Sequence, residues 1–447
     1  MAEITIPWGP ETLTIQLPAD WTVVQTATAS IPRAGEDWPD RLAAALTRPE
    51  GLPPLDKMLA ARTGGRICLI VEDLTRHSPL PMILAIIFRE LDHARVPREN
   101  VEIVFATGLH TPMTPAEAAA KIGPELARSV RWRCNPYAER KAQVRLGRVR
   151  VPHIGSVDVM VDRGVAGADL RILVSSVSPH LQAGFGGGYK MLVPGCAALE
   201  TIRQLHLCGV PRRAAQQVGQ AHAANGMRQL IDLSGQAIDR AGGATFGVQY
   251  VLDASDQVTA IAVGDVIACQ RLLAKTASAG YGSVVDAPAD VVITNASPRD
   301  FDLWQSLKSV VNTSWAVRNN GVQICVSRCP AGANKMPVTD LPFSQRFVRG
   351  VLRFIGAEAL ASLVTRLIPS FGGERAFFIR LALQTIQRHA VLIVSPKLAE
   401  EQVRMVGMPV FANMQAAFAE VEKELGKGPK RVIVFPTGGV SYPILRK

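Results

Sequence analysis

The stretch that decides the fold is RICLIVEDLTRHSPLPMILAIIFRELDHARVPRENVEIVFATG, residues 66–108. Its two ends, residues 66–73 and 101–108, are short apolar runs rich in β-branched residues, and each finishes in a turn signal, as buried strands do. Residues 80–96 between them carry the longer amphipathic pattern of a helix. A strand, a helix and a second strand in this order are typical of parallel α/β folds.

The same alternation continues through the rest of the chain. A second helical pattern covers residues 197–210, and a third runs from about 257 to 279. Further buried strands are expected at residues 170–177, 290–297, 322–328, 390–395 and 431–439. The sequence thus predicts an α/β protein of two domains whose mostly parallel sheets are flanked by helices.

A polar turn after the third helical pattern marks the expected domain boundary. We predict an N-terminal domain of residues 1–268, a helical and polar linker of residues 269–289, and a C-terminal domain of residues 290–447. Ligands of such folds gather at the carboxyl ends of the strands. We therefore expect the active site in the cleft between the two domains.

Composition narrows the class of protein. The chain has 447 residues, of which 48% are hydrophobic and 19% charged, as in ordinary globular proteins. Its 49 Lys and Arg residues exceed its 38 acidic residues, and the net charge of +11 suits small anionic ligands. The basic residues are scattered without an RNA-reading aromatic motif or zinc-finger spacing, so we do not expect a nucleic-acid partner.

Cysteines and the N-terminus indicate the compartment. The seven cysteines are odd in number and form no CxxC pair, which favours reduced cytosolic thiols over a disulfide framework. The first residues lack the basic start and apolar run of a signal peptide. No apolar run reaches the roughly 18 residues that a membrane span needs. The sequence predicts a cytoplasmic protein with no membrane contact.

Reactive side chains follow four of the expected strands. In chain order they are Asp73, Thr75 and Arg76, then His110, then His180 and Lys190, and finally Gln305 and Lys308. Because strand ends converge at one edge of a parallel sheet, their position indicates one shared site. The histidines at 77, 93, 153, 222 and 389 lack such neighbours and are interpreted as structural or surface residues.

The side chains at these strand ends suit acid–base work on an anion. Histidine has an unperturbed pKa of about 6.5, so His110 and His180 could each give and take a proton near neutral pH. Arg76 could bind a carboxylate through two parallel hydrogen bonds, and Lys308 could add a point charge.

Other residues suit the binding of a cofactor. The AGFGGG backbone, which includes Gly186, Gly187 and Gly188, could approach a phosphate closely because it lacks Cβ atoms. Lys190 follows this loop and could form a covalent bond through its amine. His206, at the end of an expected helix, could supply an imidazole nitrogen to a late transition metal.

Five ordered motifs tie these residues to a known family. They are EDLTR (72–76), TGLHTPMT (107–114), SPHLQAGFGGGYKMLVPG (178–195), TIRQLH (201–206) and SPRDFDLWQSLK (297–308). Together they resemble the catalytic subunits of nickel-pincer-dependent lactate racemases. The resemblance implies a racemase or epimerase of a small anionic 2-hydroxy acid, lactate or a related one, which closes over its cofactor.

The resemblance also implies a role for each residue. The cofactor would be a nickel-pincer nucleotide, pyridinium-3-thioamide-5-thiocarboxylic acid mononucleotide with nickel, supplied by cofactor-building enzymes. Lys190 would be its covalent attachment point and His206 the nickel ligand. Asp73, Thr75 and the three glycines would line the cofactor site, while Arg76, Gln305 and Lys308 would bind substrate. His110 and His180 would act as acid and base while the Cα hydride passes reversibly to the cofactor.

The chain departs from the family pattern at His77, Thr111, Gly186, Tyr189 and Met191, and these departures bear on the choice of substrate. Two other functions compete with racemisation. One is a catalytically silent cofactor-binding or carrier protein, although a carrier needs neither His110 nor His180. The other is a hydrolase that uses His110, His180 and His206 as zinc ligands, although no HExxH-like spacing supports it.

Overall fold

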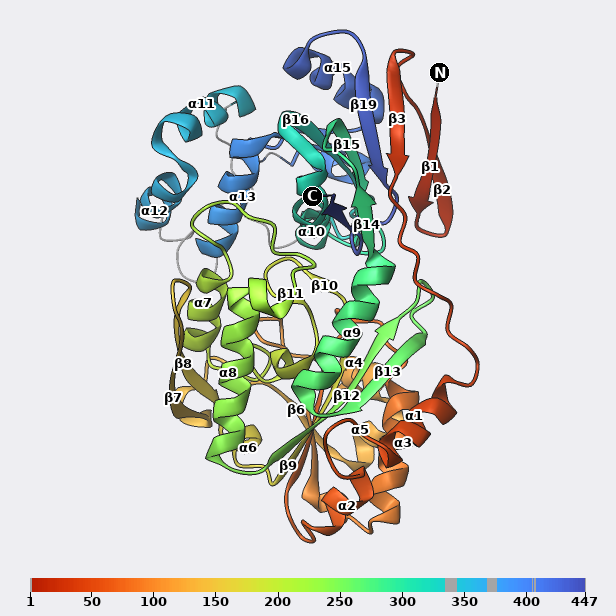
Figure 1. Cartoon of the computed structure of the whole chain (residues 1–447), viewed down its shortest axis with the longest axis vertical. Helices are drawn as coiled ribbons and strands as arrows, with labels where there is room; N and C mark the ends of the chain where they lie inside the picture. Colours follow the sequence, from red (N-terminus) through yellow and green to blue (C-terminus); the bar gives the residue numbers. More distant parts are fainter. Residues whose placement is uncertain (1, 334–343, 368–375, 404, 406, 447) are drawn as a thin grey trace. The chain divides into compact units, whose positions relative to one another are not determined.

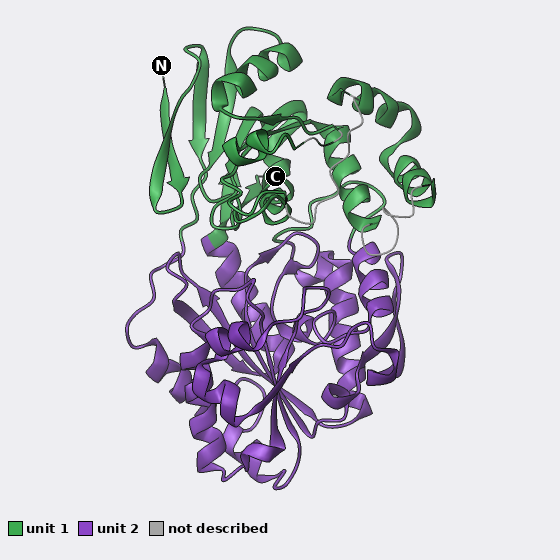
Figure 2. Ribbon diagram, turned by 180° about the vertical axis from the view of Figure 1, so that it is seen from behind, with its two compact units in different colours: residues 1–30, 210–219, 281–447 green, residues 31–209, 220–280 purple. Residues whose placement is uncertain are grey.

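The computed structural model describes residues 2–333, 344–367, 376–403, 405 and 407–446. It contains two compact units, shown in two colours in Figure 2. The N-terminal unit comprises residues 31–209 and 220–280, and the C-terminal unit comprises residues 1–30, 210–219 and 281–447. The first 30 residues, which we had expected in the first domain, therefore belong to the second unit.

A six-stranded sheet forms the centre of the N-terminal unit. In Figure 1 its strands run between helices of the same unit. Its strand order is β13-β12-β9-β4-β5-β6. Five neighbouring strands are parallel: β12 (Ala244–Leu252), β9 (Leu170–Ser176), β4 (Ile67–Val71), β5 (Val101–Phe105) and β6 (Arg131–Cys134). The strands predicted at residues 66–73, 101–108 and 170–177 are thus confirmed.

Side chains of β4 point alternately into two cores, so the whole strand is buried. Ile67, Leu69 and Val71 pack toward the side of the sheet that carries α1 (Trp38–Thr47), α2 (Leu55–Ala60) and α3 (Leu80–His93). Cys68 and Ile70 pack on the other side. That side is covered by the hairpin of β7 (Gln143–Val151) and β8 (Gly155–Asp162), by α7 (Leu199–Cys208) and by α8 (Gly226–Ala241). Burial on both faces explains the unbroken apolar run in the sequence.

Residues 257–279 do not form one helix, so this prediction was wrong for its first part. Residues Val258–Gly264 form β13, which pairs antiparallel with β12, and α9 begins only at Val266 and ends at Tyr281. A short run of small and β-branched residues is compatible with either helix or strand. The hydrogen-bonding edge of β12, which precedes β13 and pairs with it as a hairpin, favours the strand.

The C-terminal unit has a six-stranded sheet in the order β18-β17-β16-β15-β19-β3. All neighbours are parallel: β18 (Val410–Phe411), β17 (Ala390–Val394), β16 (Val317–Val326), β15 (Ala289–Asn295), β19 (Lys430–Phe435) and β3 (Trp21–Thr26). The four strands predicted after residue 290 are confirmed. The pairing of β3 with β19 explains why the N-terminal residues belong to this unit.

Helices and a hairpin cover both faces of this second sheet. One face packs on the hairpin of β1 (Glu3–Trp8) and β2 (Glu11–Gln16) and on α15 (Met414–Leu425). The other packs on α10 (Leu303–Thr313), α11 (Gln345–Ile355) and α13 (Ala376–Arg388), next to α12 (Ala357–Leu367). The fold class, an α/β protein with mostly parallel sheets flanked by helices, is confirmed.

Shorter elements complete the two units. In the N-terminal unit they are α4 (Pro115–Ile122), α5 (Pro124–Ser129), α6 (Arg163–Ala166), β10 (Pro179–His180), β11 (Gly184–Phe185) and the 3-10 turns at Arg98–Asn100, Arg140–Ala142, Gly188–Met191 and His222–Ala224. In the C-terminal unit they are α14 (Pro396–Glu400), β14 (Gly282–Val285), β20 (Tyr442–Leu445) and the turn Ser314–Ala316.

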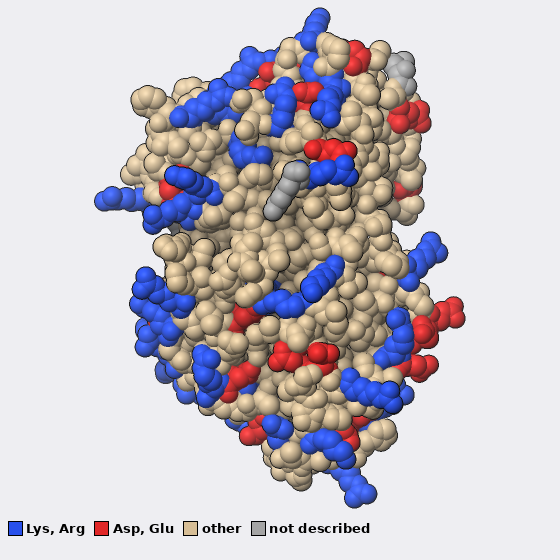
Figure 3. Space-filling view, viewed as in Figure 1, with Lys and Arg blue, Asp and Glu red and all other residues tan. Residues whose placement is uncertain are grey.

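The distribution of surface charge and the state of the cysteines can be compared with the expectations from composition. On the face drawn in Figure 3, Lys and Arg side chains are spread over both units and do not gather in one stripe. All seven cysteines are free thiols. Within the described residues, no helix combines the length and the apolar character that crossing a membrane requires.

Candidate functional site

The polar turn after β4 is held by hydrogen bonds among its own residues. One carboxylate oxygen of Asp73, Oδ1, accepts from the backbone N–H of Thr75 at 3.0 Å and from its hydroxyl at 2.6 Å. Arg76 Nη1 donates to the carbonyl and to the hydroxyl oxygen of Thr75, each at 3.0 Å. The three residues predicted together from EDLTR therefore form one connected group.

His110, which follows β5, joins this group through Asp73. Its Nδ1 lies 2.5 Å from Asp73 Oδ2, and the carboxylate is buried while the imidazole is about half exposed. Burial raises the pKa of Asp73, but the hydrogen bond and positive charge of His110 and the charge of Arg76 outweigh it, so the pKa is lowered. An ionised Asp73 accepts from Nδ1–H, which leaves Nε2 as the nitrogen for proton transfer.

A buried ion pair beneath the turn was not predicted from the sequence. Lys121 of α4 donates to Glu72 at 3.0 Å and to the backbone carbonyl of Arg76 at 2.7 Å. Ser78 also donates to Glu72, and the Tyr250 hydroxyl donates to Ser78 at 3.0 Å. These contacts fix the backbone that carries Arg76. The signal in the sequence was Glu72, an acidic residue between a buried strand and the motif residues.

His180 is fixed by backbone groups of its own loop. β10 and β11 pair antiparallel, with His180 opposite Gly184. The Nδ1 atom of His180 accepts from the N–H groups of Gln182 at 3.3 Å and Ala183 at 3.1 Å. A nitrogen that accepts two N–H groups carries no proton, so Nε2 is the protonated nitrogen of the neutral ring.

Gln182 connects this loop with His206 on α7. Its side-chain amide donates to the carbonyl of His206 at 2.9 Å. Burial, followed by the positive charges of Lys190 and His110, lowers the pKa of His206 from 6.5 to about 3. His206 is neutral at physiological pH, as a metal ligand must be.

The glycines before Lys190 adopt backbone conformations that other residues avoid. Gly187 and Gly188 have φ of +72° and +63°, and a Cβ on Gly187 would overlap the side chain of Val177. The N–H of Gly186 already donates to the carbonyl of Ser178 at 2.7 Å. Of the three glycines expected to bind phosphate, Gly186 thus has its N–H engaged within the protein.

Gln305 and Lys308 lie in the C-terminal unit, in the first turns of α10. Lys308 Nζ donates to Gln305 Oε1 at 2.5 Å, and Asp302 caps the helix by accepting from the N–H of Gln305 at 2.7 Å. The two residues predicted from one motif therefore contact each other, at the carboxyl side of β15.

The residues present fit the cofactor that the sequence implies. The buried His206 imidazole is neutral, as a metal ligand must be, and Lys190 has an amine of the kind that could form a covalent attachment. The Cβ positions of Gly187 and Gly188 face Val177 and Gln270, so these two glycines serve the close packing of the loop. Among the described residues, no three His, Cys, Asp or Glu side chains converge on a point where they could hold a metal ion. The zinc-hydrolase alternative with His110, His180 and His206 therefore has no ligand group.

Two curated relatives are similar to this chain in sequence. The lactate racemase of Thermoanaerobacterium thermosaccharolyticum is 25% identical over 335 residues, which cover 74% of this chain and 76% of the relative. The lactate racemase of Lactiplantibacillus plantarum is 26% identical over 333 residues, which cover 73% and 75%.

Solved structures show the same fold. The lactate racemase apoprotein from Thermoanaerobacterium thermosaccharolyticum matches with a TM-score of 0.78 and 21% identity, and the match covers 100% of both chains. A Thermotoga maritima protein matches with a TM-score of 0.65 and 16% identity over 91% of this chain and 98% of its own. The lactate racemase N-terminal domain family matches residues 8–218. The chain is thus similar to lactate racemases in sequence over most of its length, and residues 8–218 are similar to their N-terminal domain.

Proposed function

We propose that this protein is a racemase or epimerase of a 2-hydroxy acid, lactate or a related one, and that it works with a nickel-pincer nucleotide attached to Lys190. The observation that carries the proposal is that the rings of His110 and His180 are each oriented by hydrogen bonds at Nδ1. Each ring has its Nδ1 engaged, by Asp73 in one case and by two backbone N–H groups in the other. Nε2 of His110 is therefore the nitrogen that can take a proton, and Nε2 of His180 is the nitrogen that carries the proton of the neutral ring.

Substrate binding falls to the basic and amide side chains. Arg76 holds the carboxylate of the hydroxy acid, because its guanidinium fork matches two oxygens and its backbone is fixed by Lys121. Gln305 and Lys308 act as a pair from the C-terminal unit, with Lys308 supplying a second positive charge.

Proton transfer falls to the two histidines. In one direction one histidine takes the proton of the substrate hydroxyl, and in the return step the other histidine donates a proton on the opposite face. Asp73 stabilises the imidazolium of His110 when it forms, because the carboxylate stays ionised beside Nδ1. Racemisation requires both, since each enantiomer presents its hydroxyl to a different side.

The cofactor site is made of residues from the N-terminal unit. When bound, the cofactor supplies a reversible acceptor for the Cα hydride. Lys190 is the attachment point, His206 the nickel ligand, and Asp73, Thr75 and the glycine loop the lining. His206 suits this role because burial keeps its ring neutral.

The test is to produce the protein together with cofactor-building enzymes and to offer pure enantiomers of lactate, malate, phenyllactate and sugar acids. Chiral chromatography should show interconversion of at least one pair in both directions, and intact mass and nickel analysis should show a loaded protein. A loaded protein that changes none of these acids would favour the silent carrier.

A further inference from the structure

One face of α8 contacts the loop that carries Lys190. We call residues 182–190 the tether loop and residues Arg228, Asp232, Gly235 and Asp239 the α8 face. Their spacings of four, three and four residues place these four on one side of a helix. Neither the motifs nor the proposed chemistry assigns any of them a role.

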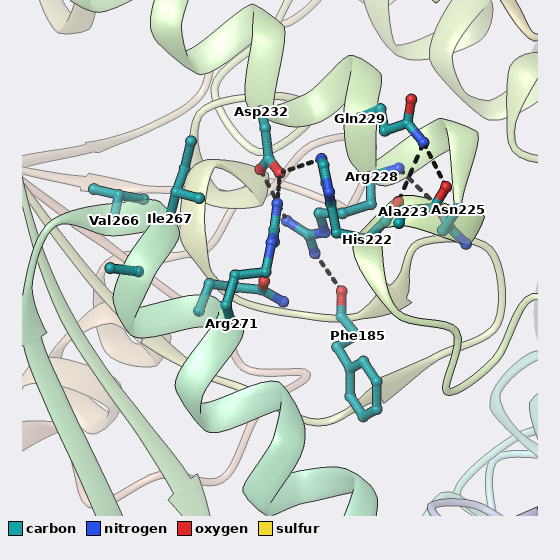
Figure 4. A network of polar contacts seen from close by, with 12 residues as sticks. Phe185, His222, Ala223, Asn225, Arg228, Gln229, Asp232, Val266, Ile267 and Arg271 are labelled. Atoms are coloured by element: carbon teal, nitrogen blue, oxygen red, sulfur yellow. Dashed lines mark hydrogen bonds and ion pairs between the residues drawn. The ribbon is translucent and has the colours of Figure 1, made fainter.

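Arg228 binds the tether loop at its glycines, as Figure 4 shows in part. Its side chain is 2% exposed, and its guanidinium donates to the carbonyl oxygens of Phe185, of Gly186 at 3.3 Å and of Gly187 at 3.2 Å. Three consecutive carbonyls thus share one cation. A planar fork with fixed donors holds their orientation in a way that a lysine ammonium cannot.

Asp232 compensates the buried charge of Arg228. Its carboxylate lies 3.7 Å from Arg228 Nη1 and pairs closely with Arg271 of α9, while His222 lies 3.8 Å away. The neighbour of Arg271, Gln270, donates to the carbonyl of Gly186 at 3.2 Å. The glycines are therefore held from α8 and α9 together.

Asn225 fixes the beginning of both the helix and the loop. Its Oδ1 caps α8 by accepting from the N–H of Arg228 at 2.8 Å, and its Nδ2 donates to the carbonyl of Gln182 at 2.8 Å. Because Gln182 also binds the carbonyl of His206, the start of α8 is connected to the end of α7.

Tyr189, the residue next to Lys190, packs on the far end of the α8 face. Its hydroxyl donates to Asp239, and its ring lies against Gly235 so closely that a Cβ there would overlap it. Tyr189 is one of the departures from the family pattern, and its partner in this chain is a glycine that leaves room for the ring.

From these contacts we infer that the α8 face positions the tether loop and sets the direction in which the Lys190 amine points. The loop is held at Gln182, at Phe185–Gly187 and at Tyr189, so Lys190 follows a backbone fixed along its whole length. The inference rests on the proposed function for the tether role of Lys190. The positioning itself can be measured without cofactor or substrate.

The test uses the apoprotein and two variants. Arg228→Lys keeps the charge but cannot serve three carbonyls, and Gly235→Ala adds only a methyl group that displaces Tyr189. We expect amide hydrogen exchange over residues 182–192 to become faster by about tenfold or more in each variant. The closed loop has lost charged hydrogen bonds in Arg228→Lys and packing in Gly235→Ala, so it opens more often. Acetylation of Lys190, measured by peptide mass spectrometry, should accelerate in parallel.

Two matched controls make the same substitutions elsewhere. Arg133→Lys changes an arginine of the N-terminal unit whose partners are Asp162 and Glu102. Gly350→Ala adds a methyl group within α11, where nothing lies within 4 Å of the added Cβ. Both should leave exchange of the tether loop and labelling of Lys190 at the wild-type rate.

Three results would overturn the inference. The first is loop exchange at the wild-type rate in both variants, and the second is an equal acceleration of loop exchange in the controls. The third is exchange that rises as much in β4 as in the loop, which would indicate a general loss of stability. If Arg228→Lys does not fold, Gly235→Ala decides alone, because it removes no polar group.

Cofactor loading separates this inference from the proposed function. Produced with cofactor-building enzymes, wild-type protein should gain mass at Lys190, and Gly235→Ala should gain it several times more slowly. A wild-type protein that never gains this mass contradicts the tether role but leaves the exchange result intact. Equal loading of both proteins, with equal loop exchange, contradicts the positioning role.

Discussion

Nδ1 of His110 lies 2.5 Å from Oδ2 of Asp73, and the two residues follow neighbouring parallel strands, β5 and β4. The same carboxylate accepts from Thr75 through its other oxygen. Asp73 thus orients His110 on one side and the turn with Arg76 on the other, so the proposed acid–base residue and the proposed substrate-binding residue are held by one buried charge.

Asp73→Asn should keep this shape but lose the charge that stabilises a protonated His110. We expect kcat for 2-hydroxy-acid interconversion to fall by about 10²-fold or more, as when a positioned acid–base group loses its partner. Kinetics of the loaded protein and intact mass, measured on the same sample, check this. A normal kcat at full cofactor loading would contradict the role given to Asp73.

Removal of either histidine should abolish interconversion in both directions. His110→Ala and His180→Ala are each expected to lose at least about 10²-fold, because every turnover uses one ring as base and the other as acid. A single remaining histidine can still support a half-reaction, which chiral chromatography would detect as a trace of 2-oxo acid. His93→Ala, at an exposed position of α3, is the control and should be active. Racemisation at the wild-type rate in both site variants would refute the mechanism.

Substitution of Lys190 should prevent attachment of the cofactor, whereas substitution of His206 should prevent binding of nickel. Lys190→Ala should gain no mass when it is produced with cofactor-building enzymes, whereas His206→Ala should gain the organic adduct and lose most of the nickel. Intact mass and metal analysis distinguish the two. The same adduct on the alanine variant of Lys190, or one equivalent of nickel in His206→Ala, would remove the corresponding assignment.

Arg76→Lys should weaken substrate binding more than cofactor loading. Lysine keeps the charge but loses the fork and the contacts with Thr75. We expect KM for the hydroxy acid to rise, and the rise to be larger at high salt because one point charge is screened more readily. Initial rates at two ionic strengths measure this effect, and an unchanged KM would exclude Arg76 from substrate binding.

His389 should make folding sensitive to acid. It is fully buried before β17, its Nε2 lies 3.0 Å from Gln323 Oε1, and burial, with Arg388 and Arg349, lowers its pKa from 6.5 to about 3. Below pH 6.5 the unfolded chain binds a proton that the folded chain does not, so stability is complete above pH 6.5 and declines toward pH 3.

From pH 6.5 to 5, this one group should remove about 1–2 kcal/mol of unfolding free energy. Thermal or urea unfolding at both pH values measures the loss. His389→Gln should lose less stability over this interval than the wild-type protein, whereas a change at exposed His93 should not alter the difference. Identical acid dependence in His389→Gln and the wild-type protein would contradict the prediction.

The strands, and the positions of the reactive residues that follow them, could be predicted because both depend on residues that are neighbours in the sequence. An apolar run such as residues 66–73 is buried on both faces wherever it lies in a parallel sheet, and Asp73 or His110 follows such a run directly in the chain. The role of His206 came from the resemblance, and its burial, which keeps the ring neutral, is visible only in the fold.

What the sequence by itself determined is therefore the fold class, the position of four motifs after strands, and the resemblance to lactate racemases. Only the tertiary structure decided that residues 258–264 pair with β12, that β3 joins β19, and that Arg228 and Gly235 contact the tether loop. The last two depend on partners distant in the chain, whereas the first depends on pairing with the preceding strand. Local periodicity indicates which residues are buried. The free energy of pairing two segments depends on both of them, so it cannot be predicted from either segment alone.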